Sequence, residues 1–169
     1  MKIRSALSAL ALVTGALFAP GFGVLSTSTD AQAATKVTHA TATSMFSSSG
    51  ITWSSSGGCS DRNNPTCTSF DQLNLDSAKG AQTLKSASGC ALNITGGTET
   101  GHAGGTYSHW NGYKIDFAMA TCVTNYVKNT FTYIGVRPGD GAPQWQSGAG
   151  NVYADEGNHW DVTFHSCGC

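Results

Sequence analysis

Two clusters of side chains in this sequence could form a catalytic metal site. His109 and Asp116 lie seven residues apart, and Glu156 lies three residues before His159. Zinc at a catalytic site takes three protein ligands from His, Asp or Glu and leaves the fourth position to water. A nearby carboxylate can accept the proton of that water while the metal polarises the bond under attack. The residue types therefore indicate a hydrolase that uses Zn²⁺.

The first cluster is predicted to lie at the start of a strand. Apolar and polar residues alternate over 113–118, which places Lys114 and Asp116 on the same polar face. His109 precedes Asp116 by an odd number of residues, so a straight strand would direct the two side chains to opposite faces. Gly112 lies between them and allows a bend or bulge. Both side chains could then reach one metal ion.

The second cluster leads into another predicted strand, over 159–165. Its polar face carries His159 and Asp161, and its apolar face consists of alternate residues, namely Trp160, Val162 and Phe164. Because Asp161 shares a face with His159, we expect it to orient a ligand imidazole from outside the coordination sphere.

The remaining pattern predicts an α+β fold with a mostly antiparallel sheet and helices packed on one side. A helix is expected from Thr68 or Ser69 to residue 87, followed by Gly89 as a stop. A Gly-rich loop over 96–108 contains Glu99 and His102. Further elements are expected as strands over 91–95, 131–136 and 151–155, a short helix over 121–129, and a turn-dense loop over 137–143.

The N-terminal residues are predicted to be a secretory leader. Lys2 and Arg4 precede an apolar run over 6–18, and Ala31 and Ala33 form an A-x-A cleavage signal. Residues 1–33 are therefore expected to be removed from a secreted, extracellular protein without a membrane anchor. Residues 34–50 are Ser/Thr-rich and are predicted to be a loosely attached segment, and residues 51–169 to be the folded domain.

Charge and size exclude some classes of partner. Removing two cations and one anion with the leader leaves seven Lys plus Arg against nine Asp plus Glu, a net charge of −2. No basic stripe follows, so we expect no nucleic-acid partner. The mature chain has the size of one domain, and we expect a monomer.

The cysteines are expected to form disulfides, because six of them lie in an exported chain. Cys59 and Cys67 bracket a turn-rich loop and are the preferred pair. Cys167 and Cys169 are expected to bond to separate partners, with Cys90 and Cys122 as candidates. A thiolate zinc site is the competing interpretation, although no C-x-x-C pair occurs.

The two clusters also resemble motifs of a known family. His109, Gly112, Asp116 and Phe117, with Ser108 directly before His109, are similar to the S-x-H-x-x-G-x-x-x-D-[FI] signature of zinc D-alanyl-D-alanine carboxypeptidases and L-alanyl-D-glutamate endopeptidases, in which the serine stands two residues before the histidine. Their fold group includes lysostaphin-type endopeptidases and the Hedgehog signalling domain. The second motif of the family resembles the segment from Glu156 to Trp160, and the resemblance extends over residues 68–164.

The resemblance implies a secreted peptidase for short peptides with D-amino acids, such as peptidoglycan stems. It implies that His109, Asp116 and His159 bind zinc and that Glu156 is the general base. The family usually has an arginine, which helps to hold the oxyanion, where this sequence has Glu99. The candidates to replace that arginine are His102, Arg62 and Lys114, and Glu99 is expected to bind a substrate ammonium or to pair with Lys114. His102 and Ser108 are expected to flank the cleft.

Two alternatives to a peptidase stay open at this point. One is a catalytically silent, zinc-stabilised module that binds cell-wall peptide or a protein. The other is a disulfide-rich inhibitor or structural protein without metal.

Overall fold

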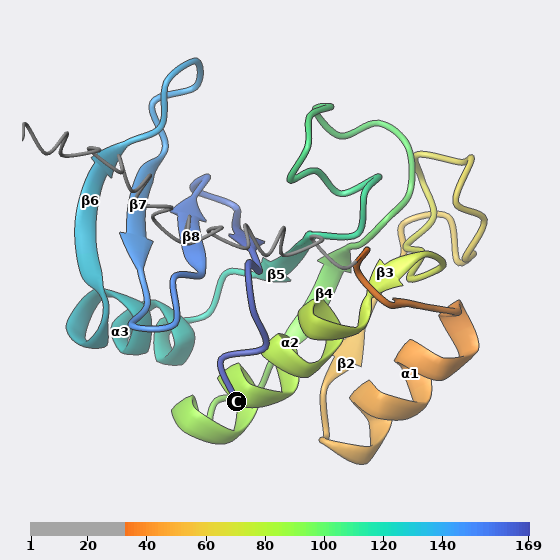
Figure 1. Ribbon diagram of the computed structural model, residues 1–169, viewed down its shortest axis with the longest axis horizontal. Helices are drawn as coiled ribbons and strands as arrows, with labels where there is room; N and C mark the ends of the chain where they lie inside the picture. The colour runs from red at the N-terminus through yellow and green to blue at the C-terminus, as the bar shows by residue number, and fades with distance from the viewer. Residues whose placement is uncertain (1–32) are drawn as a thin grey trace, which may run out of the picture. The chain divides into compact units, whose positions relative to one another are not determined.

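A seven-stranded sheet forms the framework of residues 33–169, the part of the chain that the computed structural model describes (Figure 1). Its strand order is β2-β4-β5-β9-β8-β7-β6, and only the β2–β4 pair is parallel. The strands are β2 Thr52–Trp53, β4 Asn93–Gly96, β5 Lys114–Ala118, β6 Thr132–Val136, β7 Pro143–Gln146, β8 Val152–Asp155 and β9 His159–Thr163. The predicted α+β class with a mostly antiparallel sheet is confirmed.

Helices and site-bearing loops lie on opposite sides of the strands. The helices α1 (His39–Ser48), α2 (Leu75–Ser88) and α3 (Thr121–Thr130) run along one side in Figure 1. The loop after β4 and the β6–β7 loop rise from the other side. A short two-stranded sheet of β1 (Lys36–Val37) and β3 (Leu73–Asn74) completes the fold of these residues.

The two central strands carry the predicted alternation. Ile115 and Phe117 of β5, and Trp160 and Val162 of β9, are fully buried in the apolar core. Their neighbours point to the opposite face, where Asp116 of β5 lies directly across from Asp161 of β9. Because side chains alternate along a strand, the register between β5 and β9 places the apolar side chains on one face of the sheet and Asp116 and Asp161 on the other.

Helix α2 begins later than predicted. Its cap is Asn74, not Thr68 or Ser69, because Leu73 and Asn74 pair with β1 as strand β3. Its end at Gly89, which adopts a left-handed conformation with φ of 67°, is as predicted. A glycine in the middle of the helix, Gly80, has a packing role: a Cβ there would lie 2.3 Å from the ring of Phe164.

The N-terminal segment is folded, so the prediction that residues 34–50 are loosely attached is wrong. Thr38 caps α1 by accepting a hydrogen bond from the N–H of Thr41 at 3.2 Å. Ala42 and Phe46 of this helix are fully buried, and Phe46 meets Phe70 edge to face with ring centroids 5.0 Å apart. These two buried residues, one turn apart, anchor the helix to the core, and Met45 packs partly buried against the same core. The folded domain therefore begins before residue 51.

Replacing Phe46 with Ala is expected to lower the free energy of unfolding by about 3–5 kcal/mol, because a fully buried aromatic ring is lost from the core. Urea unfolding followed by tryptophan fluorescence measures this change. Ser47→Ala, at an exposed position of the same helix, is the control and should change the value by less than about 0.5 kcal/mol. Equal free energies of unfolding for the two variants would instead support the prediction that residues 34–50 are loosely attached.

Three disulfides cross-link the described residues, consistent with an extracellular or oxidising environment. The Cys59–Cys67 pair is as predicted. The other prediction is wrong: Cys90 bonds to Cys122, and Cys167 bonds to Cys169. The C-terminal segment is instead held by Asn151, whose Oδ1 accepts hydrogen bonds from the N–H groups of residues 165 and 166 at 2.8 and 3.1 Å.

The predicted leader, residues 1–33, lies outside the described residues except for its last position. Within residues 33–169, none of the helices combines the length and apolar character that a membrane crossing requires.

Candidate metal centre

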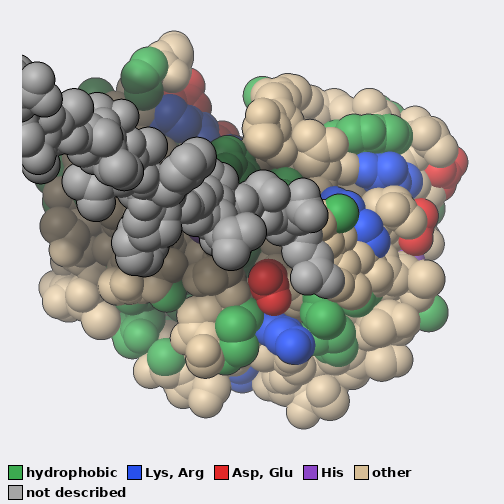
Figure 2. Space-filling view, viewed as in Figure 1, with side chains coloured by type: hydrophobic (Ala, Val, Ile, Leu, Met, Phe, Trp, Pro, Cys, Tyr) green, Lys and Arg blue, Asp and Glu red, His purple; other side chains and the backbone are tan. Residues whose placement is uncertain are grey.

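A polar cavity of about 530 Å³ lies over the site face of β5 and β9. Its walls come from the loop after β4, the β6–β7 loop and the β8–β9 turn. Figure 2 shows acidic and basic side chains beside the notch between the two loops. The charged and histidine residues that line the cavity are His102, His109, Lys114, Asp116, Arg137, Asp140, Glu156, His159 and Asp161.

Asp116 is the centre of this group. Its side chain is buried, and Gly96 on the neighbouring strand leaves room for it: a Cβ at that position would lie 2.5 Å from Asp116 Oδ2. Asp116 Oδ1 is buried and receives no hydrogen bond from residues 33–169. A buried carboxylate oxygen without a partner destabilises the fold unless a positively charged group lies close enough to neutralise it.

His109 reaches Asp116 from the turn that precedes β5. Gly112, with φ of 76°, closes this turn, and its N–H donates to His109 O at 2.8 Å. The ring Nδ1 of His109 donates to the carbonyl of Gly97 at 2.6 Å, which leaves Nε2 facing Asp116 Oδ1 at 3.2 Å. Burial lowers the pKa of His109, but the interaction with Asp116 outweighs it and raises the pKa above its ordinary value. The predicted bend at Gly112 is confirmed.

His159 approaches the same oxygen from the start of β9. Its Nδ1 lies 2.7 Å from the side-chain oxygen of Asn158, and its Nε2 lies 3.6 Å from Asp116 Oδ1. The Glu156 carboxylate is its other neighbour, with Oε2 at 3.3 Å from Nε2. The four residues predicted from the sequence are therefore brought together in one cavity.

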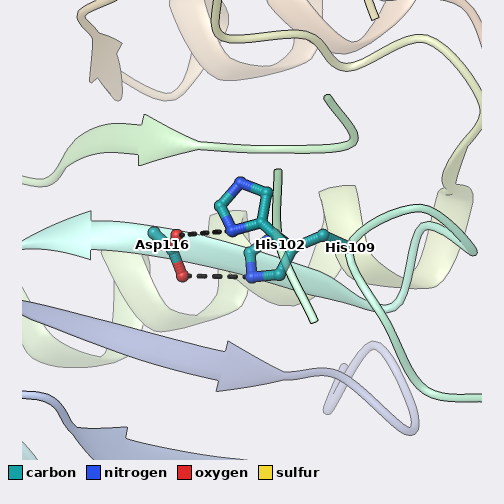
Figure 3. Close-up of side chains that lie close together, drawn as sticks. All are labelled: His102, His109 and Asp116. Atoms are coloured by element: carbon teal, nitrogen blue, oxygen red, sulfur yellow. Dashed lines mark ion pairs between the residues drawn. The ribbon is translucent and has the colours of Figure 1, made fainter. Parts of the chain in front are cut away.

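A third imidazole, His102, faces the other oxygen of Asp116. Its Nδ1 lies 3.7 Å from Asp116 Oδ2 (Figure 3), and its Nε2 lies 3.2 Å from Glu99 Oε1. Glu99 is buried, and its carboxylate also accepts the N–H groups of Ser69 and Gly97 at 2.7 and 3.0 Å. Burial raises the pKa of Glu99, but these hydrogen bonds outweigh it and lower the pKa below its ordinary value. Glu99 thus orients His102, and it does not pair with Lys114.

His102, His109 and Asp116 form a group that could hold a metal ion. The rings of His102 and His109 are stacked, however, with centroids 3.8 Å apart and planes inclined by 16°. The lone pair of an imidazole nitrogen lies in its ring plane, so two stacked rings cannot both direct lone pairs at one ion. In this orientation the two histidines address different oxygens of Asp116, and His102 would have to rotate away from Glu99 to share an ion with His109.

The donor set fits a divalent cation in two respects. In a tetrahedral zinc site, neighbouring ligand atoms lie roughly 3.3 Å apart, and the nitrogens of His109 and His159 lie 3.2 and 3.6 Å from Asp116 Oδ1. His159 nevertheless lies outside the group of ligand atoms within 4.8 Å of one another, which consists of His102, His109 and Asp116. With neutral histidines, the cavity has a net charge of −2, from two cations and four carboxylates: Lys114 and Arg137, and Asp116, Asp140, Glu156 and Asp161.

Asp161 lies beside the predicted ligands but is engaged elsewhere. Its Oδ2 accepts from Lys114 Nζ at 2.5 Å and from Arg137 Nη1 at 2.7 Å, whereas its Oδ1 lies 3.9 Å from His109 Nε2. Burial raises the pKa of Asp161, but the charge of Lys114 and these hydrogen bonds outweigh it and lower the pKa. The imidazole of His109 is oriented by the Gly97 carbonyl and not by Asp161.

Two predicted cleft residues and one candidate cation lie away from the cavity surface. Ser108 is buried and stabilises the turn, because its Oγ accepts the N–H of Asn111 at 3.2 Å. Arg62 stacks on Trp110, 3.6 Å from the ring centroid, and does not line the cavity. Glu99 lies behind His102.

Sequence reasoning missed Arg137, which it placed only in a turn-dense loop. Arg137 is one of two arginines in residues 33–169, and its guanidinium lines the cavity beside Glu156 and Asp161. A charged residue in a Gly/Pro-rich loop of a charge-poor chain is the signal that could have marked it.

No protein-family profile, curated protein or solved structure matches this chain.

Proposed function

We propose that the protein is a zinc-dependent hydrolase of short peptides. The observation that supports this most directly is Asp116 Oδ1, a buried carboxylate oxygen without a hydrogen bond that two imidazole nitrogens face at 3.2 and 3.6 Å. We assign the metal ligands as His109, Asp116 and His159, an open three-ligand set of the kind that hydrolytic zinc sites use. The stacking of His102 on His109 supports leaving His102 out of this set.

The bound zinc would supply a water of lowered pKa and polarise the carbonyl under attack. Glu156, whose Oε2 lies 3.3 Å from His159 Nε2, accepts a proton and returns one to the departing amine. Lys114 and Arg137 line the same cavity and supply N–H donors on the side of Asp161. The substrate class, peptidoglycan stem peptides with D-amino acids, rests on the resemblance of the two sequence motifs.

A catalytically silent zinc module is the second candidate, and one observation favours it. Both carboxylate oxygens of Glu156 are engaged, Oε1 by Arg137 and Oε2 by His159. These contacts occupy lone pairs on both oxygens that would otherwise accept the proton of a bound water.

Metal content and turnover, measured together, test the proposal. The purified mature chain is expected to contain about one zinc ion and to release new products from muropeptides, detected by mass spectrometry. A chelator should abolish the products, and added zinc should restore them. Zinc without products would favour the silent module, and a chain without metal would favour the disulfide-rich inhibitor.

A further inference from the structure

The guanidinium of Arg137 joins three separate segments of the cavity wall. Its Nε lies 3.1 Å from both carboxylate oxygens of Asp140 in its own loop. Its Nη1 donates to Asp161 Oδ2 of β9 at 2.7 Å, and its Nη2 contacts Glu156 Oε1 in the β8–β9 turn. The hydrogen bonds to Asp140 are the largest of the causes that raise the pKa of Arg137.

Glu156 has few other constraints on its side chain. Glu156 begins a short turn in which Gly157 has φ of 83°. The N–H of Glu156 donates to His159 O at 3.1 Å. Its side chain is 29% exposed and has three rotatable bonds. Holding such a side chain in one rotamer costs conformational entropy. A planar guanidinium that is itself fixed at two other points can hold it at little further cost.

We propose that Arg137 is a positioning residue that fixes Glu156 with Oε2 directed at His159. This role rests on the proposed function, in which Glu156 is the base. Asp140 holds the guanidinium at Nε and Asp161 holds it at Nη1. The remaining contact, from Nη2, therefore determines where Glu156 Oε1 lies. A residue of the β6–β7 loop thereby positions Glu156, which belongs to the β8–β9 turn.

Arg137→Met, which keeps an unbranched apolar stem but removes the N–H groups, tests the proposal by two measurements. We expect kcat on muropeptides to fall by about 10- to 100-fold, as for a misplaced catalytic group, with KM within about 3-fold of wild type and zinc content unchanged. Hydrogen exchange of residues 155–159, followed by mass spectrometry, should become several-fold faster. Asp140→Asn loosens the anchor without touching Glu156 and should change both measurements in the same direction but less.

Lys128→Met is the matched control, because Lys128 pairs with Asp155, next to Glu156, at 2.8 Å. It should leave kcat unchanged. Unchanged kcat in Arg137→Met, unchanged exchange at residues 155–159, or loss of zinc together with kcat would each overturn the positioning role. If wild-type protein hydrolyses nothing, the proposed function fails, and faster exchange in Arg137→Met still supports the contact between Arg137 and Glu156 while unchanged exchange removes it.

Discussion

Asp116→Asn is expected to remove the bound zinc. The Asp116 carboxylate is the proposed ligand that both His109 and His159 face, and an amide oxygen has no charge to balance a cation. Wild-type protein should gain about 2.7 kcal/mol of unfolding free energy at a free zinc concentration 100 times Kd, and the variant should gain none. Urea unfolding in chelator and in buffered zinc measures this difference, and elemental analysis gives the metal content directly.

The matched control for this change is Asp155→Asn, another carboxylate-to-amide change, on a strand that does not line the cavity. It should retain the full zinc-dependent gain in stability. A variant of Asp116 that still binds zinc as wild type does would remove the assignment of the ligands. Comparison with His102→Ala then identifies whether the stacked histidine contributes to binding.

Glu156→Gln is expected to lower kcat by about 10²- to 10⁴-fold, the usual contribution of a general base. The amide keeps the shape of the side chain but cannot accept the proton. Zinc content should stay near that of wild type, because Glu156 is not among the assigned ligands. Steady-state kinetics on muropeptides, with elemental analysis of the same preparation, measures both quantities.

Undiminished turnover by the Glu156 variant would transfer the role of base to another group, with His102, which also lines the cavity, as a candidate. Asp155→Asn again serves as the control and should retain wild-type kcat. Comparing Glu156→Gln with Asp155→Asn separates the loss of a proton acceptor from the loss of a negative charge near the β8–β9 turn.

The parts of the site that sequence reasoning placed correctly depend on local geometry. Strand alternation predicted that Asp116 and Asp161 lie opposite the core, and the structure pairs them across β5 and β9. The glycine at position 112 indicated the turn that lets His109 face Asp116. Both inferences depend only on the sequence within a few residues of the side chain concerned.

The parts that it missed depend on contacts distant in sequence. Arg137 reaches Glu156 across 19 residues and Asp161 across 24. The start of α2 is displaced because Leu73 pairs with Val37, and a helix-cap pattern contains no information about that strand. The region from residue 34 to 50 has only two buried apolar side chains in α1, so its composition resembles a linker although its helix is packed.

The cross-strand register at the centre of the sheet restricts how this chain can vary in length. Adding or deleting one residue inside β5 would turn Asp116 toward the apolar core and expose Phe117, and the same change in β9 would displace Asp161. By contrast, the loop around Gly104 has open space around it, and an inserted residue there leaves the strand faces intact. Relatives of this protein with the same chemistry should therefore differ in loop length while keeping both central strands free of gaps.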